Sequence, residues 1–244
     1  MASQDLAAQV VLITGGTAGI GLSLAEAYLE RGAAVVVCGR SPEPLSRFNH
    51  MHAEALAIRA DVTDAAARSL LLDEVARRFG RLDVLINNAG TFVERNFAAE
   101  CDATNGLEQE IATNLTAPIQ LTNDVLNRWP KLTALVFVTS GFAFVSPTRA
   151  PTYGAVKAGL HGFAEGLRKQ LAPTTHVLEL LPPTTDTTMN AGYAGKKISP
   201  EAVAAATLKA LDRRRPRALP GPAKVLPIML RIAPNTVKRS VAKM

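Results

Sequence analysis

The sequence predicts an α/β fold: a three-layer, doubly wound parallel sheet in a single domain. Short runs of apolar, often β-branched residues alternate regularly with longer helical patterns along the chain. The apolar runs lack the polar alternation of a half-exposed strand, which is typical of parallel strands buried on both faces. The length, 244 residues, suits one large α/β domain better than two small ones.

Six strands are expected from these apolar runs, in chain order. They cover residues 9–14, 33–38, 56–60, 82–87, 133–140 and 175–181. The expected helices cover about residues 20–30, 63–78, 107–128, 153–171 and 200–213, with a short helix after Pro42. We expect Thr63 to cap the 63–78 helix and Gly80 to end it, and residues 88–102 to be irregular. Parallel strands joined by crossover helices define a Rossmann-type sheet.

The composition excludes several other classes of protein. Hydrophobic residues make up 48% and charged residues 20%, so the chain is too apolar to be a disordered one. Two cysteines, Cys38 and Cys101, cannot build a disulfide framework, and neither they nor the four histidines have the spacing of a metal site. We therefore expect a reducing environment and no bound metal.

The sequence shows no segment typical of export or membrane insertion. The first ten residues lack the charged and apolar regions of a secretory signal. Every apolar run is broken well before the roughly 20 residues that a membrane-spanning helix needs. We expect a cytoplasmic protein.

Basic residues are concentrated near the C-terminus. Nine of the 27 basic residues lie in residues 213–244, where there is no acid, which leaves 18 basic against 21 acidic residues in 1–212. The expected organisation is a folded body over residues 1–212 that contains the active site, followed by a basic, proline-broken tail over 213–244. Because the body has no basic surplus, we expect no binding of nucleic acid.

A glycine-rich turn, TGGTAGIG, follows the first strand at residues 14–21. Glycines there permit unusual backbone angles and let a pyrophosphate approach the N–H groups at the start of the next helix. An ordinary glycine-rich turn is the alternative, but the position between a clear strand and a helix favours a dinucleotide-binding site. The expected cofactor contacts in this turn are Gly15, Thr17, Gly19, Ile20 and Gly21.

From this turn onward, over about residues 9–190, the sequence resembles the classical short-chain dehydrogenase/reductase family. Further motifs follow in the family's order and at its spacings: Asp61-Val62 after the third strand, the NNAG segment of residues 87–90 after the fourth, Asn114 in TNLTAP, Ser140 at the end of the fifth, and the YxxxK pair Tyr153 and Lys157. Any one of these motifs arises readily by chance, whereas the full ordered set is specific.

Catalytic roles are implied by this resemblance. Tyr153 and Lys157 are four residues apart on a helix, so their side chains share one face. A free tyrosine titrates near 10, and we expect the lysine cation and an oxidised nicotinamide ring to lower that pKa. In the family's pattern Tyr153 protonates the carbonyl oxygen, Ser140 orients that oxygen, Lys157 also holds the nicotinamide ribose, and Asn114 holds a water that relays protons. A structural tyrosine and a polar helix kink are the alternatives for Tyr153 and Asn114.

Cofactor choice is predicted from the end of the second strand. The resemblance assigns the adenine ring to Asp61 and Val62, and further cofactor contacts to Asn88, Ala89 and Gly90. An acid that would repel a 2′-phosphate is absent after the second strand, where Arg40 and Ser41 stand instead. One charge-assisted hydrogen bond contributes about 1.5–3 kcal/mol, which favours NADP(H) over NAD(H). A solvated arginine is the alternative, and the basic residue that the family usually carries inside the glycine turn is missing.

The loop after the sixth strand departs from the family. Pro183 stands where the family usually has glycine, while Thr187 still fits the residue that contacts the carboxamide. Both are expected cofactor contacts. Residues 189–197 resemble the family's mobile substrate lid.

The tail is the second departure from the family. Residues 218–220 are expected as a short edge strand, followed by a cluster of large apolar residues: Val225, Leu226, Ile228, Met229, Leu230 and Ile232. A helix packed on the body or on a partner subunit is the favoured interpretation, with weak contact to a membrane surface as the alternative. Nucleic-acid binding is least favoured because no aromatic residue accompanies the basic residues of the tail. By its resemblance the protein is expected to form a homodimer or homotetramer.

The leading hypothesis is an NADP(H)-dependent oxidoreductase that interconverts a carbonyl and an alcohol on a small organic or lipophilic substrate. The alternative is a regulatory or scaffold protein that binds NADP(H) without turnover and docks through its tail. The complete set of Asn114, Ser140, Tyr153 and Lys157 favours the enzyme, since a pure binder needs no acid.

Overall fold

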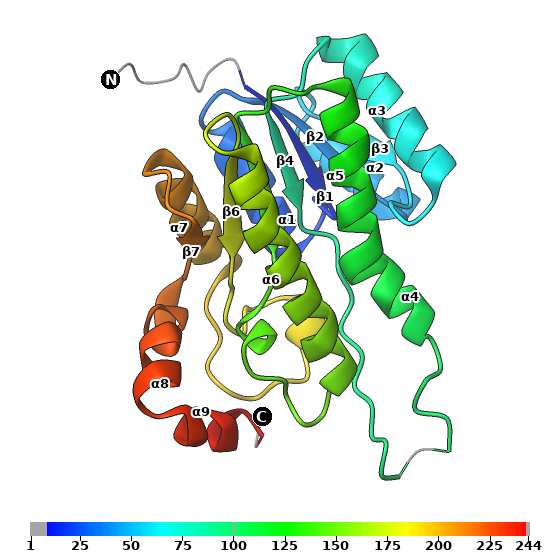
Figure 1. Ribbon diagram of the computed structural model, residues 1–244. Helices are drawn as coiled ribbons and strands as arrows, with labels where there is room; N and C mark the ends of the chain where they lie inside the picture. The colour runs from blue at the N-terminus through cyan, green and yellow to red at the C-terminus, as the bar shows by residue number, and fades with distance from the viewer. Residues whose placement is uncertain (1–8, 100, 243–244) are drawn as a thin grey trace.

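The computed structural model describes residues 9–99 and 101–242. Within them, seven parallel strands form one sheet in the order β3-β2-β1-β4-β5-β6-β7, with helices on both faces (Figure 1). The strands are β1 (Val10–Thr14), β2 (Ala34–Gly39), β3 (Leu56–Arg59), β4 (Val84–Asn87), β5 (Ala134–Val138), β6 (His176–Leu180) and β7 (Arg217–Ala218). The helices are α1 (Gly19–Leu29), α2 (Pro42–Met51), α3 (Ala65–Phe79), α4 (Leu107–Ile111), α5 (Ala117–Arg128), α6 (Pro151–Leu171), α7 (Pro200–Asp212), α8 (Leu226–Ile232) and α9 (Pro234–Val241). The predicted fold class is confirmed.

Both faces of the sheet are buried, which explains the continuous apolar runs. Successive side chains of a strand point to opposite faces. In β1, Val11 and Ile13 belong to the core shared with α1 and α7, whereas Val10 and Leu12 belong to the core shared with α3, α5 and α6. A polar residue at any of these positions would therefore face a helix rather than solvent.

The winding reverses at β1, which lies between β2 and β4. In open α/β sheets the ligand crevice forms outside the carboxyl ends of the strands at such a reversal. The glycine turn after β1 and the segment after β4 meet there, because Thr14 Oγ1 accepts hydrogen bonds from the N–H groups of Asn88 (3.0 Å) and Ala89 (2.9 Å).

Two local predictions are corrected by the structure. The 107–128 helix is divided into α4 and α5 by a π-helical turn over Ala112–Thr116. The residue that caps α3 is Asp64, whose carboxylate accepts the N–H of Ala67, and not Thr63. The Thr63 hydroxyl instead donates to the Asp61 carboxylate, because the turn before the helix directs it backward along the chain.

The sheet continues beyond residue 212 into the basic segment. Strand β7 pairs with the end of β6 and so forms the edge of the sheet one residue earlier than expected. A 3₁₀ turn (Gly221–Val225) then leads into α8 and α9, which lie at the end of the molecule reached by the carboxyl ends of the strands (Figure 1). In the described part of the chain, none of the helices combines the length and apolar character needed to cross a membrane.

Asp83, directly before β4, is hydrogen-bonded to Val10, the first residue of β1, and a substitution at Asp83 tests how much this contact stabilises the sheet. Its buried carboxylate accepts the N–H of Val10 at 2.8 Å. We expect Asp83→Ala to lower the free energy of unfolding by about 1–3 kcal/mol, because the buried N–H loses its acceptor. The measurement is urea denaturation followed by circular dichroism.

Asp73→Ala is the matched control for Asp83→Ala. Asp73 forms a largely exposed ion pair with Arg128 at 2.7 Å, so its loss is expected to cost less than about 1 kcal/mol. Equal losses for the two variants would contradict the role assigned to Asp83.

Candidate active site

The glycine turn leaves the N-terminus of α1 open toward the crevice. Gly15 and Gly19 have φ angles of +64° and +53°, in the left-handed region that favours glycine. Ala18 caps α1 without a side-chain hydrogen bond, and no acid lies in the first turn. The free N–H groups at this helix start fit the pyrophosphate of a dinucleotide.

Close packing explains two further glycines of the turn. A Cβ at Gly21 would lie 2.3 Å from the carbonyl oxygen of Gly15, and one at Gly16 would lie 2.5 Å from Cγ1 of Val37. Both distances are far inside van der Waals contact. Gly16, which the sequence did not single out, is therefore needed for the turn to lie on β2.

Thr187 lies against the glycine turn, and its contact with the carboxamide stays a prediction. A Cβ at Gly19 would be 2.8 Å from Cγ2 of Thr187. The Pro183 carbonyl accepts the hydroxyl of Thr185, and the expected cofactor contact of Pro183 stays a prediction. The backbone of Thr185 bridges to Ile198, which closes the base of the 184–198 loop that contains the expected lid.

The NNAG segment supports the glycine turn from the side of β4. The Asn88 amide donates to the carbonyls of Thr14 (2.9 Å) and Gly15 (3.1 Å). The Asn88 side chain is thus occupied in holding the turn. Gly90 marks the point where the segment meets the predicted catalytic groups, since a Cβ there would lie 2.8 Å from Asn114 Oδ1 and 3.6 Å from Lys157 Nζ.

Two arginines, Arg40 and Arg59, lie at the end of β2 and are joined by one hydrogen bond to the backbone. Arg40 is exposed, and Arg59 of β3 donates from Nε to the Arg40 carbonyl at 3.2 Å. Arg59 was missed in the sequence because it lies 19 residues away, but the parallel register that sets it opposite Gly39 brings the two together. Ser41, also exposed, is the N-cap of α2 and makes no capping hydrogen bond with its side chain.

Asp61 lies close to this pair with its carboxylate already hydrogen-bonded. Partial burial raises the pKa of Asp61, but hydrogen bonds from Thr63 and the charge of Arg40 outweigh burial and lower the pKa below its ordinary value. The next residue, Val62, is buried, and its carbonyl accepts a hydrogen bond from Arg68.

Ser140, Tyr153 and Lys157 come together at the carboxyl end of β5, as predicted. All three are buried. The Ser140 side chain lies close enough to Tyr153 to lower the pKa of the phenol, and its Oγ accepts the N–H of Phe142 at 3.1 Å. Lys157 Nζ donates to the Val138 carbonyl at 3.0 Å and lies 5.7 Å from the centre of the Tyr153 ring.

Burial changes the acid–base balance of this group. It raises the pKa of Tyr153 to about 12, with the Ser140 hydrogen bond acting against the rise and the Glu110 charge adding to it. Burial also lowers the pKa of Lys157 to about 8. Desolvation of the phenolate is thus the largest influence on the pKa of Tyr153. The lowering expected from the lysine cation together with an oxidised nicotinamide ring stays a prediction.

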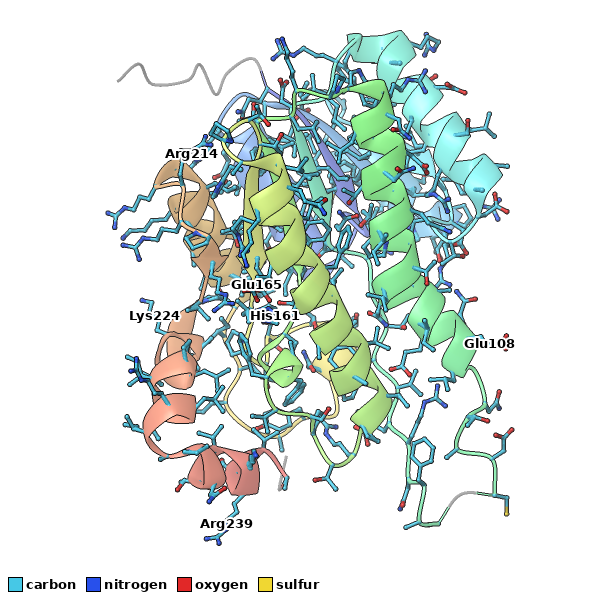
Figure 2. All side chains as sticks on the ribbon, in the orientation of Figure 1. Glu108, His161, Glu165, Arg214, Lys224 and Arg239 are labelled. Carbon is cyan, nitrogen blue, oxygen red and sulfur yellow. The ribbon has the colours of Figure 1, made fainter. Side chains whose placement is uncertain are left out.

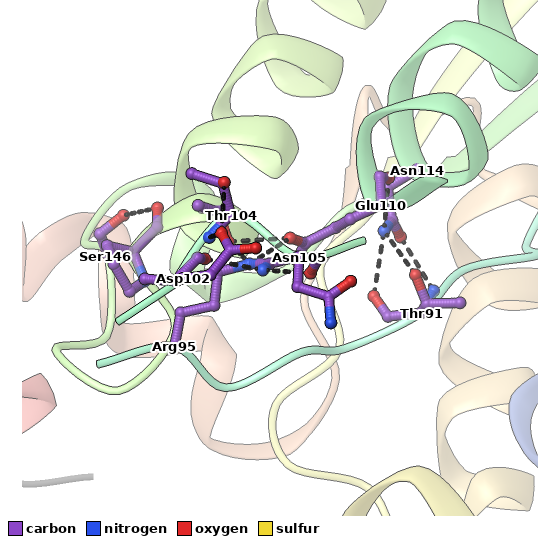
Figure 3. A network of polar contacts seen from close by, with 11 residues as sticks. Thr91, Arg95, Asp102, Thr104, Asn105, Glu110, Asn114 and Ser146 are labelled. Carbon is purple, nitrogen blue, oxygen red and sulfur yellow. Dashed lines mark hydrogen bonds and ion pairs between the residues drawn. The ribbon is translucent and has the colours of Figure 1, made fainter. Parts of the chain in front are cut away.

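Asn114 is fully buried in the π-helical turn, and its side chain is used for structure. Its amide nitrogen donates to the carbonyls of Thr91 (3.0 Å) and Glu110 (3.1 Å), while Oδ1 accepts the Thr91 N–H (Figure 3). The amide thus holds the segment after β4 against the helix. The relay water implied by the family resemblance stays a prediction. The Asn114 side chain would not donate to that water, because both N–H groups of its amide already donate to backbone carbonyls.

A buried ion pair beside Asn114 was not detected in the sequence. Arg95 Nε lies 3.3 Å from Glu110 Oε2, which also accepts the Thr152 hydroxyl at 2.8 Å (Figure 3). Arg95 Nη1 further donates to the carbonyls of Ala103 and Asn105. The pair therefore joins the 88–106 segment, α4 and the start of α6, one residue before Tyr153. Its residues belong to no motif, so only the tertiary structure reveals it.

Within the described residues, no group of three or more His, Cys, Asp and Glu side chains is placed to hold a metal ion. The arrangement offers a dinucleotide cradle and a buried acid–base group instead.

Solved structures with the same arrangement bind a nicotinamide cofactor. A short-chain dehydrogenase from Burkholderia cenocepacia in complex with NADP superposes with a TM-score of 0.85 at 25% identity, covering 98% of this chain and 99% of that one. An actinorhodin polyketide ketoreductase variant with NADPH gives a TM-score of 0.77 at 26% identity, covering 86% and 92%. The fold and site thus define an oxidoreductase of the dinucleotide-binding α/β class.

Sequence similarity gives the family. Residues 9–197 match the short chain dehydrogenase family. The uncharacterized oxidoreductase DltE of Bacillus subtilis is 39% identical over 184 residues, which make up 74% of this chain and 73% of DltE. The short chain dehydrogenase/reductase dpchG of Colletotrichum higginsianum is 34% identical over 172 residues, 67% of this chain and 63% of dpchG. The chain belongs to the short-chain dehydrogenase family.

Removing Glu110 tests the buried pair. We expect Glu110→Ala to lower the free energy of unfolding by about 3–5 kcal/mol, because the Arg95 guanidinium is left buried without its partner. The double variant Arg95→Leu/Glu110→Leu is expected to recover most of that loss, since it buries no charge. Chemical denaturation measures the free energy of unfolding of the unaltered protein and of the two variants.

Asp212→Ala, which breaks the partly exposed pair with Arg31, is the control and is expected to cost less than about 1 kcal/mol. If Glu110→Ala cost no more than this control, the pair would not stabilise the site.

Proposed function

We propose that this protein is an NADP(H)-dependent short-chain oxidoreductase that interconverts a carbonyl and an alcohol on a small organic or lipophilic substrate. The buried Ser140 and Tyr153, which lie close together, with Lys157 Nζ beside the Tyr153 ring, carry the proposal. Their position at the carboxyl end of β5, beside the crevice where the winding reverses, is where a substrate would meet a bound dinucleotide.

Tyr153 is the proposed acid in reduction. Its high pKa keeps the phenol protonated at neutral pH, so the hydroxyl can donate to a carbonyl oxygen as negative charge develops there. The Ser140 hydroxyl donates to the same oxygen and fixes its position. Bound NADP(H) would supply the hydride, or accept it in the reverse direction. Lys157 would hold the nicotinamide ribose, and its cation favours the phenolate left after proton transfer.

Arg40 and Arg59 support NADP(H) as the cofactor. They bring two guanidinium groups to the end of β2, where a 2′-phosphate on the adenine ribose would lie, and no acid takes the place of Arg40. Guanidinium groups bind phosphate through charge-assisted, often paired hydrogen bonds. The α1 N-terminus would hold the pyrophosphate. Two structural neighbours that contain NADP or NADPH agree with this choice.

Aromatic side chains around Tyr153 support a lipophilic substrate. Phe92 contacts the Tyr153 ring edge-on, with 4.9 Å between ring centres, and Phe142 lies on another side at 6.4 Å. Neither ring offers a hydrogen bond to a polar substrate group. A carbonyl compound with apolar or aromatic substituents fits these surroundings, and the polyketide ketoreductase neighbour is consistent with it.

Loss of the Tyr153 hydroxyl tests the catalytic assignment. Tyr153→Phe is expected to lower kcat on an identified ketone by about 10²–10⁴-fold, because the proton donor is removed while the ring remains. NADPH binding, measured by fluorescence titration, is expected to stay near that of the unaltered protein. Tyr28→Phe, in the α1 core, is the matched control. Turnover within a few-fold of the unaltered enzyme would exclude Tyr153 as the acid.

Reversing the charge at Arg40 tests the cofactor. Arg40→Asp is expected to shift the ratio of kcat/KM for NADPH to that for NADH by about 10–100-fold toward NADH, because attraction at the 2′-phosphate becomes repulsion. Arg47→Asp, an exposed arginine on α2, is the control and is expected to leave the ratio unchanged. An unchanged ratio in Arg40→Asp would remove Arg40 from the cofactor site.

A further inference from the structure

Three large apolar side chains of the C-terminal segment face away from the body. Val225, Ile228 and Ile232 are 55%, 61% and 70% exposed. Their spacing of three and four residues places them on one side of α8 and the turn before it. We call these three residues the tail face. The same helix packs inward through Leu226, whose Cδ2 would lie 3.2 Å from a Cβ at Gly141.

Basic residues lie next to the tail face in the sequence and on the following helix, α9. Lys224, Arg231, Lys238 and Arg239 are all exposed, and no acid occurs in the sequence after Asp212. Figure 2 shows Lys224 and Arg239 extending away from the rest of the molecule. Exposed apolar side chains with cations on either side are typical of a helix that lies in the interface of an anionic bilayer.

We propose that the tail face docks the protein reversibly on an anionic lipid surface. Its isoleucines and valine enter the headgroup region, and the neighbouring lysine and arginines pair with lipid phosphates. Each cation near such a surface strengthens binding, so the four basic residues add to the contribution from burying three apolar side chains.

The composition of residues 213–244 argues against two other partners for the tail face, a second copy of this chain and a single-stranded nucleic acid. A symmetric contact with a second copy would place the same patch of each chain against the other. The two basic segments would then repel each other, because neither contains an acidic residue. Single-stranded nucleic acid is bound through stacking on aromatic rings, and residues 213–244 contain none.

Docking holds the active site beside the lipid surface. Leu226 of α8 contacts the turn that begins directly after Ser140, and this turn also contains Phe142. Carbonyl compounds dissolved in the bilayer are therefore the substrates to which the docked protein has the shortest path. This consequence rests on the function proposed above, whereas the docking itself does not.

Vesicle sedimentation with the full chain tests the docking. The protein is expected to sediment with vesicles of phosphatidylcholine and phosphatidylglycerol, and at least about tenfold less with phosphatidylcholine alone. Binding is expected to weaken as salt rises, because the screening length falls from about 10 Å at 0.1 M to about 3 Å at 1 M.

Two variants divide the apolar and the cationic contributions. Ile228→Glu/Ile232→Glu and Lys224→Gln/Arg231→Gln/Arg239→Gln are each expected to lower the partition coefficient at least about tenfold. Leu70→Glu, at a leucine of α3 that is 69% exposed, and Arg47→Gln/Arg78→Gln/Lys169→Gln, at exposed bases outside the segment, are the controls and should bind normally. All variants alter exposed positions, and circular dichroism checks that they fold.

Three results would overturn the proposal. They are no binding to the anionic vesicles, equal binding to both kinds of vesicle, and unchanged binding of Ile228→Glu/Ile232→Glu. If that variant instead dissociated an oligomer in sedimentation velocity while lipid binding persisted, the tail face would be a subunit interface. Sedimentation with vesicles requires no turnover. A failure of docking therefore does not contradict the proposed oxidoreductase activity, and a failure to find activity does not contradict docking.

Discussion

The geometry of the site depends on hydrogen bonds that join the carboxyl end of β1 to that of β4. The Thr14 hydroxyl accepts the N–H groups of Asn88 and Ala89, and the Asn88 amide returns two hydrogen bonds to the carbonyls of Thr14 and Gly15. These contacts hold the glycine turn in its left-handed conformation with the α1 N-terminus open. They also fix the start of the segment that leads to Gly90, behind which Asn114 and Lys157 lie.

A second layer of buried polar contacts supports the acid–base group. Asn114 and the Arg95–Glu110 pair connect the 88–106 segment with α4 and with α6, the helix that carries Tyr153 and Lys157. Burying an ion pair gives little net stability, so its value here lies in fixing one arrangement of three segments. The Glu110 charge also acts on Tyr153 through space, and with burial it keeps the phenol protonated until substrate and cofactor change its surroundings.

The C-terminal segment extends this arrangement outward. Strand β7 completes the sheet at the edge next to β6, and α8 then reaches back to the turn that follows Ser140. The match to the family ends at residue 197, before this segment begins. A fold of this kind hosts many functions, so segments at the rim of the site are where properties particular to this protein are expected to arise.

The parallel sheet and the motif residues around the crevice could be predicted from the amino-acid sequence. Each of these is encoded locally: apolar runs specify strands buried on both faces, and Ser140, Tyr153 and Lys157 lie in motifs with fixed spacing. Tertiary structure alone decided which groups act on one another. Arg59 joins Arg40 only through the β2–β3 register, and Glu110 meets Arg95 and Thr152 only across three segments. Burial raises the pKa of Tyr153, and this desolvation depends on the whole surrounding fold, whereas the spacing of Tyr153 and Lys157 records only their nearness.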